Sequence, residues 1–169
     1  MKIYITSGTQ DYLQKIVDEN EGQTLILLQD IDEQTMLLHE TNNETIFNEG
    51  REYEVLDQTG ELTSTGYAVL NNIPVTDEGR PLFEYRFKNR ARMVEDEPGF
   101  VAIRVLRPLN SDTYIILTLW QSEKDFLSWQ TSKAYDHAHK KRGTAEGVDQ
   151  QPIFPRPSYA TKYNIVELK

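Results

Sequence analysis

The stretch "FVAIRVLRPLNSDTYIILTLWQS", residues 100–122, contains two apolar runs joined by the tetrapeptide "PLNS". Both runs are rich in β-branched and other apolar residues, whereas the Pro, Asn and Ser between them favour a turn. The stretch therefore predicts a β-hairpin with strands at 100–108 and 112–122.

The segments on either side of this hairpin alternate between strand and helix patterns. Before it, residues 67–75 predict a strand, and residues 79–99 carry apolar side chains at helical spacing. After it, a capping box at 122–125 predicts a short helix, and residues 159–168 predict a closing strand. The order from residue 66 is β-α-β-β-α-β, the ferredoxin-like pattern of an α+β protein. This pattern alone does not indicate a function.

The first 65 residues form a separate group of predicted elements, and a boundary falls at 62–66. We therefore expect an N-terminal α+β extension at 1–65 and a ferredoxin-like domain at 66–169. The elements expected in the extension are strands at 2–8, 24–30 and 34–41, a helix at 9–20, a short strand and a turn at 42–50, and a segment at 51–62 that is either a strand or a short helix, with a helix favoured at its start.

Composition limits the class of protein. The 169 residues are 38% hydrophobic and 27% charged, as in ordinary globular proteins. The absence of cysteine excludes disulfides, thiolate nucleophiles and Cys-ligated metal centres. Because we find no signal-peptide pattern and no apolar run long enough to span a bilayer, we expect a cytoplasmic protein.

The net charge of −9 argues against a nucleic-acid binder, and it is unevenly distributed. Residues 1–65 carry three basic and 14 acidic residues, whereas the remainder carries 15 basic and 13 acidic ones. The run "HKKR" at 139–142 would attract an anionic ligand. The alternative is that its lysines only solvate a helix end.

The segment "SKAYDHAHKKR" (132–142) holds two of the three histidines. On a helix, His139 shares one face with Tyr135 and Arg142. His137 lies about 200° away on a helix of 3.6 residues per turn and is expected to face solvent. His139 is therefore the candidate ligand, with a semi-buried structural histidine as the alternative.

Two further residues are candidates for a site. Trp129 lies ten positions before His139, and its alternative role is that of a core anchor. Asn71 shares a strand face with apolar residues, where an amide needs a partner; its alternative role is an edge or turn device. His39, in "LLHE", is expected to be structural.

The runs "AVLNN", "ILTLWQSEKDFLSW" and "SKAYDHAHKKR" resemble the antibiotic-biosynthesis-monooxygenase (ABM) family, in its IsdG-type haem-degrading branch. That branch combines an Asn on the first strand with a Trp and a His ten residues apart. The whole chain is similar to the HmoB-type subgroup, which has an N-terminal extension. The runs "GRPLFEYRFKNRA", "EPGF" and "IRVLRPLNSDTY" carry this second likeness.

The resemblance implies a ferredoxin-like ABM domain whose N-terminal extension completes a pseudo-dimeric β-barrel within one chain, and hence a monomer. It implies a haem-degrading monooxygenase for which haem is both substrate and cofactor. Dioxygen and electrons would complete the reaction. The electron donor would be external, because the sequence has no dinucleotide-binding motif.

The resemblance also implies residue roles. His139 resembles the axial ligand of the haem iron, and Asn71 resembles the distal residue that hydrogen-bonds dioxygen or water on that iron. Trp129 resembles the bulky side chain that distorts the macrocycle. From charge alone, Lys140, Lys141 or Arg142, and secondarily Arg86 or Arg90, would approach the propionates.

Three alternatives remain open. The chain also resembles TRAP-type regulatory proteins, and a non-catalytic haem-binding protein would need the same ligand. A cofactor-free ABM oxygenase acting on an aromatic polyketide or quinone would not need His139 as a ligand. The presence of Asn71, Trp129 and His139 together favours the haem-degrading enzyme.

Overall fold

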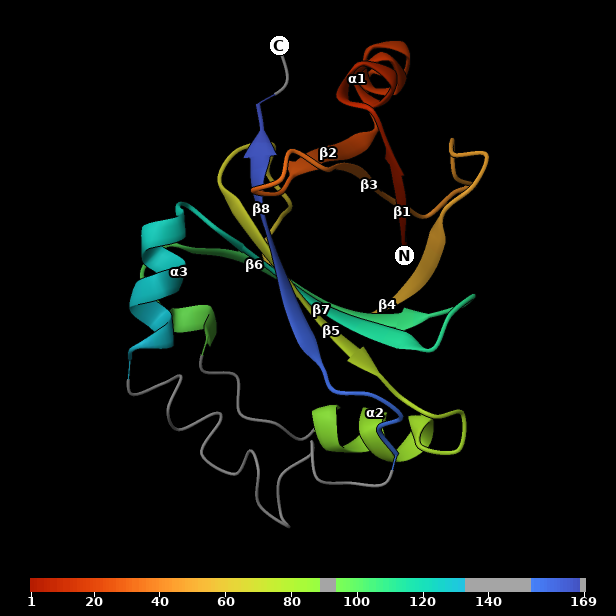
Figure 1. Ribbon diagram of the computed structural model, residues 1–169, viewed down its shortest axis with the longest axis vertical. Helices are drawn as coiled ribbons and strands as arrows, with labels where there is room; N and C mark the ends of the chain where they lie inside the picture. The colour runs from red at the N-terminus through yellow and green to blue at the C-terminus, as the bar shows by residue number, and fades with distance from the viewer. Residues whose placement is uncertain (89–93, 133–152, 168–169) are drawn as a thin grey trace.

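The computed structural model describes residues 1–88, 94–132 and 153–167. The strands in these ranges are β1 (Lys2–Gly8), β2 (Thr24–Gln29), β3 (Thr35–Thr41), β4 (Arg51–Thr59), β5 (Tyr67–Pro74), β6 (Phe100–Pro108), β7 (Thr113–Trp120) and β8 (Tyr159–Val166). The helices are α1 (Gln10–Glu19), α2 (Arg80–Lys88) and α3 (Glu123–Gln130), with a 3₁₀ turn at Val94–Asp96. The strands close into an antiparallel barrel in the order β1-β3-β2-β8-β5-β7-β6-β4 (Figure 1).

The two halves of the barrel repeat one pairing scheme. In the first half β1 pairs with β3 and β4, and β2 pairs with β3. In the second half β5 pairs with β7 and β8, and β6 pairs with β7. The β4–β6 and β2–β8 pairs join the halves. The prediction of a pseudo-dimeric barrel completed by the N-terminal strands is therefore confirmed.

The barrel interior is an apolar core to which every strand contributes. Side chains alternate between the two faces of a strand, so every second residue points inward. The buried residues of this core are Ile3, Ile5, Ile26, Leu28, Met36, Leu38, Tyr53, Ala68, Leu70, Ala102, Leu106, Ile115, Leu117, Leu119, Tyr163 and Ile165. Burying each of the larger aliphatic side chains contributes about 1.5–3 kcal/mol.

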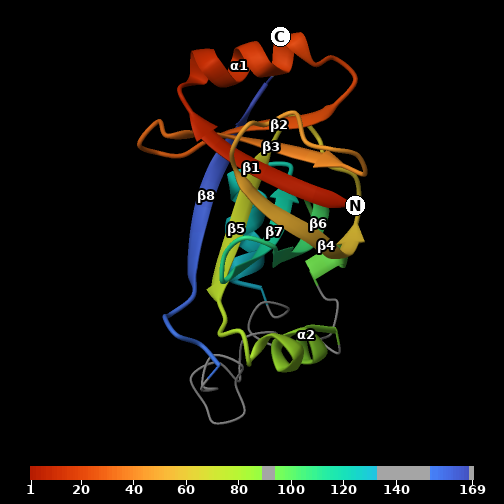
Figure 2. The ribbon, with the colours of Figure 1, turned by 90° about the vertical axis from the view of Figure 1, so that its right-hand side faces the viewer.

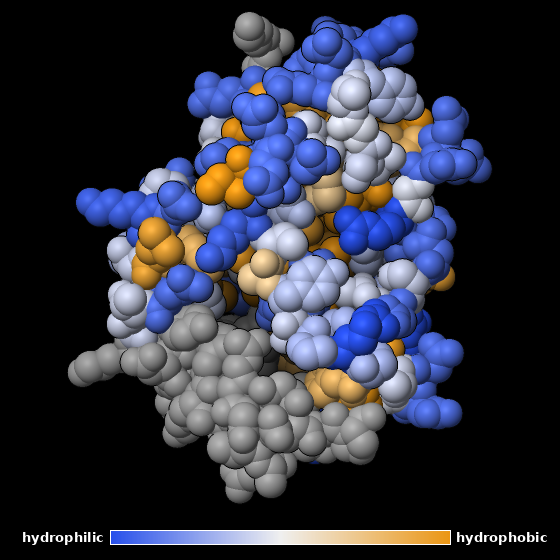
Figure 3. Space-filling view, viewed as in Figure 1, coloured by the Kyte–Doolittle hydropathy of each residue, from blue (hydrophilic) through white to orange (hydrophobic). Residues whose placement is uncertain are grey.

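The helices cover the outer faces of the barrel. Helix α1 packs on the first half through Leu13. Thr9, the residue before the helix, caps it by accepting a hydrogen bond from the Tyr12 amide (3.2 Å). Figure 2 shows the barrel between α1 at one end and α2 at the other. Hydrophilic side chains dominate the surface around α1 (Figure 3). No described helix is long and apolar enough to cross a membrane.

Two sequence predictions for the first half are wrong. The segment that favoured a helix at its start, within 51–62, forms strand β4. Pairing of this segment with β1 and β6 and burial of Tyr53 inside the barrel outweigh its local preference. Residues 42–50 contain bends but no strand, and Phe47 from this segment is buried against β3.

The long helix expected at 79–99 is observed as α2 followed by the 3₁₀ turn, with 89–93 outside the described residues. The helix expected at 132–142 also lies outside them, apart from Ser132. The hairpin, the closing strand and the capped helix α3 are confirmed.

A buried ion pair joins the two halves inside the barrel. The Arg104 Nε on β6 donates to the Glu40 Oε2 on β3 at 2.7 Å, and the two side chains are only 4% and 10% exposed. Arg104 Nη1 also donates to the carbonyls of Thr59 (3.2 Å) and Ile103 (2.9 Å). These contacts satisfy a charge that would otherwise be costly to bury.

We predict that Glu40→Gln destabilises the protein by about 3–5 kcal/mol, because it leaves the Arg104 charge buried without its counter-charge. The matched control is Glu54→Gln, since Glu54 pairs with Arg107 at 3.1 Å but is 48% exposed. Loss of this exposed pair should cost only about 0.2–1 kcal/mol. Urea unfolding measures both, and equal losses would contradict the assigned role of the buried pair.

Candidate functional site

The candidate site is the outer face of the second-half sheet, between α2 and α3. Alternate residues of β5 point to this face: Val69 belongs to the apolar cluster under α3, and Ile73 belongs to the cluster under α2. Asn71 lies between them on the same face. Its cross-strand neighbour Ile116 on β7 packs against both clusters, so the two meet at Asn71.

Asn71 offers an amide that the described part of the chain does not use. It is half-buried, with Ile116 on one side and Ala160 on the other in the sheet register. Its side chain makes no hydrogen bond to a described residue. The prediction that this amide shares a face with apolar residues is confirmed, and an unused amide on such a face is suited to a ligand.

Asn72, the next residue, points the opposite way and has a structural role. It is 3% exposed, and its Nδ2 donates to the carbonyls of Leu70 (3.0 Å) and Tyr159 (3.2 Å) and to the Thr161 Oγ1 (3.1 Å). These contacts tie β5 to β8. Asn71 and Asn72 therefore point to opposite faces of the sheet, because successive side chains of a strand alternate between the faces.

Trp129, at the end of α3, borders the candidate site on the α3 side of Asn71. Its ring lies 5.5 Å from the Trp120 ring and 6.0 Å from the Phe126 ring, between centroids. Trp120 is fully buried and donates its Nε1–H to the Thr118 Oγ1 at 3.1 Å. Trp129 itself is half-buried. It is thus anchored on the core, as its alternative role required, yet it keeps part of its surface accessible.

Ser122 determines where α3 begins and so where Trp129 lies. Its Oγ accepts a hydrogen bond from the Asp125 amide at 3.2 Å and donates to the Asp125 carboxylate at 2.9 Å. The N-cap expected from the sequence is confirmed, although the Asp125 carboxylate accepts from the Ser122 hydroxyl and not from its amide, as a full capping box requires.

Helix α2 forms the aromatic wall on the other side of Asn71. Phe83 is buried against Tyr114 (4.6 Å), Phe87 (5.6 Å) and Phe154 (6.2 Å), between ring centroids. Gly79 precedes this helix, and a Cβ there would lie 2.3 Å from the Ile153 Cβ. The position therefore requires glycine for the 153–154 segment to pack against α2.

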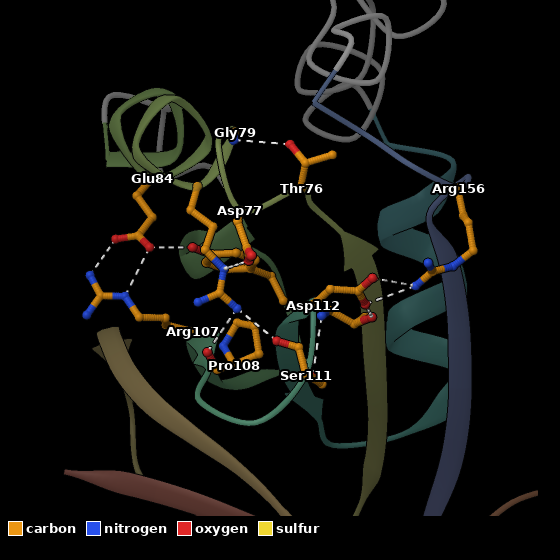
Figure 4. A network of polar contacts seen from close by, with 12 residues as sticks. Thr76, Asp77, Gly79, Glu84, Arg107, Pro108, Ser111, Asp112 and Arg156 are labelled. Carbon is orange, nitrogen blue, oxygen red and sulfur yellow. Dashed lines mark hydrogen bonds and ion pairs between the residues drawn. The ribbon is translucent and has the colours of Figure 1, made fainter.

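A polar network attaches α2 to the β6–β7 hairpin (Figure 4). The Glu84 carboxylate on α2 accepts hydrogen bonds from the Arg107 Nε (3.0 Å) and the Tyr114 hydroxyl. Arg80 donates to the carbonyls of Pro108 (3.1 Å) and Ser111 (2.8 Å). The Arg107 guanidinium and the Tyr114 hydroxyl hold the pKa of Glu84 below its ordinary value. Burial and the Glu84 carboxylate raise the pKa of Tyr114.

Sequence reasoning did not find this network. Glu84 and Arg107 are 23 residues apart, and Glu84 and Tyr114 are 30 apart, with no local motif. Only the packing of α2 on the hairpin brings them together.

Several predicted site residues lie outside the described residues. These are His139, Lys140 and Arg142, together with His137, Lys141 and Arg90. Their roles stay predictions. Within the described ranges no group of three or more His, Asp or Glu side chains is arranged to hold a metal ion.

His39 has the structural role expected for it. It is fully buried on the outer face of β3, with Nε2 2.9 Å from the Gln23 Oε1 and Nδ1 3.4 Å from the Thr45 Oγ1. Burial lowers its pKa, so the ring is neutral at pH 7. Phe47, 5.6 Å away between ring centroids, helps to cover it.

The first half thus fills the place that corresponds to the candidate site. Phe47 is 8% exposed and packs on β3, whereas the corresponding face of the second half presents the accessible amide of Asn71. A surface cleft between α1 and residues 46–49 remains in the first half, with Tyr12 and Lys15 among its lining residues. It shares no lining residue with the candidate site.

The ferredoxin-like strand order and the site between two helices agree with the fold and site of one protein family. A family model described as antibiotic biosynthesis monooxygenase matches residues 66–141. Over 82 residues the chain is 36% identical to a mycobilin-producing haem oxygenase of Mycobacterium tuberculosis, and the match covers 47% of this chain and 78% of that protein. The chain belongs to the antibiotic biosynthesis monooxygenase family, a family of oxidoreductases.

A relative aligns along nearly the whole chain. The chain is 28% identical over 162 residues to a haem-degrading monooxygenase of Listeria monocytogenes, and the match covers 94% of this chain and 96% of that protein. The resemblance to haem-degrading members of the family is therefore confirmed, and it includes the N-terminal extension.

The same fold also occurs under names that denote regulation. The chain is 26% identical over 144 residues to signal transduction protein TRAP of Staphylococcus aureus, covering 82% of this chain and 83% of that protein. The solved structure of a major regulator of staphylococcal pathogenesis has a TM-score of 0.85 with 21% identity, covering 98% and 99% of the two chains. At that identity the structural likeness shows the fold alone.

We predict that Glu84→Gln costs about 1.5–3 kcal/mol of unfolding free energy at neutral pH, because it removes charge-assisted hydrogen bonds that attach α2. Since the pKa of Glu84 is lowered from its ordinary 4.5, its contribution is fully present above that value and is lost as the pH falls through the lowered pKa. Urea unfolding from neutral to acid pH should show a smaller acid loss for Glu84→Gln than for the wild type.

The control for this experiment is Glu78→Gln, because Glu78 is an exposed carboxyl in the turn before α2. It should keep the wild-type acid dependence. An acid dependence of Glu84→Gln identical to that of the wild type would contradict the role of Glu84.

Proposed function

We propose that the protein is a haem-degrading monooxygenase that binds haem on the outer face of the second half, between α2 and α3. The observation that carries this proposal is the unused amide of Asn71 on an apolar face, with Trp129 on one side and the aromatic residues of α2 on the other. Haem would be opened with dioxygen and external electrons, and iron would be released.

The residues of this face suit a flat, largely apolar ring. The lining is aliphatic and aromatic, including Ile73, Ile116 and Phe87, and polar contacts are few. Ligand sites in proteins commonly combine such a lining with a small number of placed polar groups. A single imidazole suffices as a protein ligand for haem iron, and we assign that role to His139, ten residues after Trp129.

When bound, haem supplies the capacity to activate dioxygen, and the protein's residues bind, orient and distort it. Asn71 would help to hold the haem from the sheet, where its unused amide could form a hydrogen bond. Trp129, supported by Trp120, would contact the haem from α3 and distort it. Arg142 and Lys140 meet the propionates, since both cations lie in the basic run near His139.

The remaining assignments belong to the same proposal. Residues 1–65 serve as an extension that completes the barrel, and residues 66–169 form the catalytic domain, in a cytoplasmic monomer. The electron donor is an external protein or small reductant. Sizing with light scattering tests the monomer, and a concentration-independent mass twice that of one chain would overturn it.

A regulatory protein is the second candidate, because of the likeness to the TRAP protein. A regulatory protein has no need for Asn71, Trp129 and His139 together. The two candidates differ in one observable, which is the disappearance of bound haem when reductant and oxygen are supplied.

We predict that haemin added to the protein gives a Soret band, and that ascorbate in air makes this band decay with release of chelatable iron. Catalase is present throughout, so bleaching by free peroxide is excluded. His139→Ala should abolish both the band and the decay, whereas His137→Ala, two residues away, should retain them. A Soret band that forms and persists would reduce the function to haem binding, and no band at all would exclude haem as a ligand of this protein.

We further predict that Asn71→Ala binds haemin but degrades it roughly 10- to 100-fold more slowly, the equivalent of losing a hydrogen bond to a charged group. Asn72→Ala is the matched control on the opposite face of β5. It should lose about 1–3 kcal/mol of stability, because buried partners are left unsatisfied, yet keep the degradation rate. A stable Asn71→Ala variant with the wild-type rate would remove Asn71 from the site.

A further inference from the structure

A chain of aromatic side chains leads from the candidate site to the surface. Trp129 lies 5.5 Å from Trp120, Trp120 lies 5.8 Å from Phe126, and Phe126 lies 6.1 Å from Tyr67, between ring centroids. Tyr67 and Trp120 are also direct cross-strand partners in the β5–β7 ladder. Cross-strand partners on one face hold their Cβ atoms about 4.5–5.5 Å apart. Trp129 is thus in ring contact with Trp120, and Trp120 is linked to Tyr67 through the ladder pairing and through the Phe126 ring between them.

The chain ends in a phenol that is hydrogen-bonded to a carboxylate. Tyr67 is 5% exposed, and its hydroxyl donates to the Glu123 Oε2 at 3.2 Å. Glu123 is an exposed residue in the first turn of α3. Packing under α3 would be served by a phenylalanine, as it is at Phe126. The Tyr67 hydroxyl is therefore the feature of this cluster that packing does not require.

We propose that Trp129, Trp120 and Tyr67 form a relay that carries a one-electron oxidising equivalent from the haem site to the surface, with Glu123 as the proton acceptor. This inference rests on the proposed function, because the oxidant is haem activated by hydrogen peroxide. It extends that function with a second redox path, which operates when the oxidising equivalent is not consumed by the haem ring.

The relay balances in electrons and protons. Trp129 gives one electron to the oxidant, Trp120 gives one electron to Trp129, and Tyr67 gives one electron to Trp120. As Tyr67 loses its electron, its hydroxyl proton passes to the Glu123 carboxylate, so a neutral phenoxyl radical remains. A small surface reductant such as ascorbate then returns one electron, and the proton returns from Glu123.

The acid–base state of Tyr67 suits this role. Burial and the hydrogen bond to Glu123 raise the pKa of Tyr67 to about 12, so the resting phenol keeps its proton at neutral pH. Oxidation makes a phenol strongly acidic, and the hydrogen-bonded carboxylate then accepts the proton without diffusion of water into the cluster. This coupled proton loss explains why the oxidising equivalent moves from the indole to the phenol, while the electron moves the opposite way.

The haem-free protein provides the test. Pulse radiolysis with azide generates azidyl radicals, which oxidise indoles in preference to phenols at neutral pH. We expect the indolyl radical absorption to decay as phenoxyl absorption grows, at a rate independent of protein concentration. Tyr67→Phe should lose this fast growth, Trp120→Phe should slow it, and Glu123→Gln should slow it while leaving the first indolyl yield unchanged.

Tyr85→Phe is the control, because Tyr85 is 68% exposed on α2 and lies outside the aromatic chain. It should leave the fast growth intact. Circular dichroism of each variant verifies that the fold is retained. Fast growth that survives in a folded Tyr67→Phe variant would overturn the relay.

The haem-loaded protein gives an independent readout. After peroxide treatment without reductant, mass spectrometry should find oxidation shifted from Tyr67 toward Trp129 and Trp120 in Tyr67→Phe, and an unchanged pattern would count against the relay. If haemin does not bind but the radical transfer occurs in the haem-free protein, the proposed function fails and the relay stands. If haem is degraded but no transfer occurs, the proposed function stands and the relay fails.

Discussion

Closure of the barrel by strands of the same chain stabilises both halves of the protein. The second-half sheet β8-β5-β7-β6 has an apolar inner face and two edge strands. An apolar face and unpaired strand edges are both unfavourable in water unless they are covered. The first half covers that face, and β4 and β2 pair with the two edges. Because one chain supplies both halves, the buried Arg104–Glu40 pair forms within a single fold rather than across an interface.

The repeated pairing scheme then leaves two equivalent outer faces, and the chain treats them differently. In the first half α1, Phe47 and the neutral, hydrogen-bonded His39 form a closed core. In the second half Asn71 separates two apolar clusters, and its amide makes no bond to the described residues. On one common framework, the described residues therefore fill the outer face of the first half and leave an amide unused on that of the second.

The sequence predicted most of the elements, and its failures have physical causes. The hairpin of β6 and β7 and the Ser122 cap carry local signals that the structure retains. Strand β4 was mispredicted because its conformation comes from pairing with β1 and β6, which no local window contains. The orientation of Asn71 followed from strand alternation. The attachment of α2 through Glu84, Arg107 and Tyr114 did not, since these residues meet only after the helix docks.

Nuclear magnetic resonance of the side-chain amides can locate the bound haem on the protein surface. Ferric haemin is paramagnetic and broadens nearby resonances, while zinc protoporphyrin serves as a diamagnetic reference. We predict that haemin removes the Asn71 amide signal and preserves those of Asn20 and Asn48, which line the cleft beside α1. Loss of the Asn20 and Asn48 signals with Asn71 unaffected would place haem on the first half and overturn the proposed site.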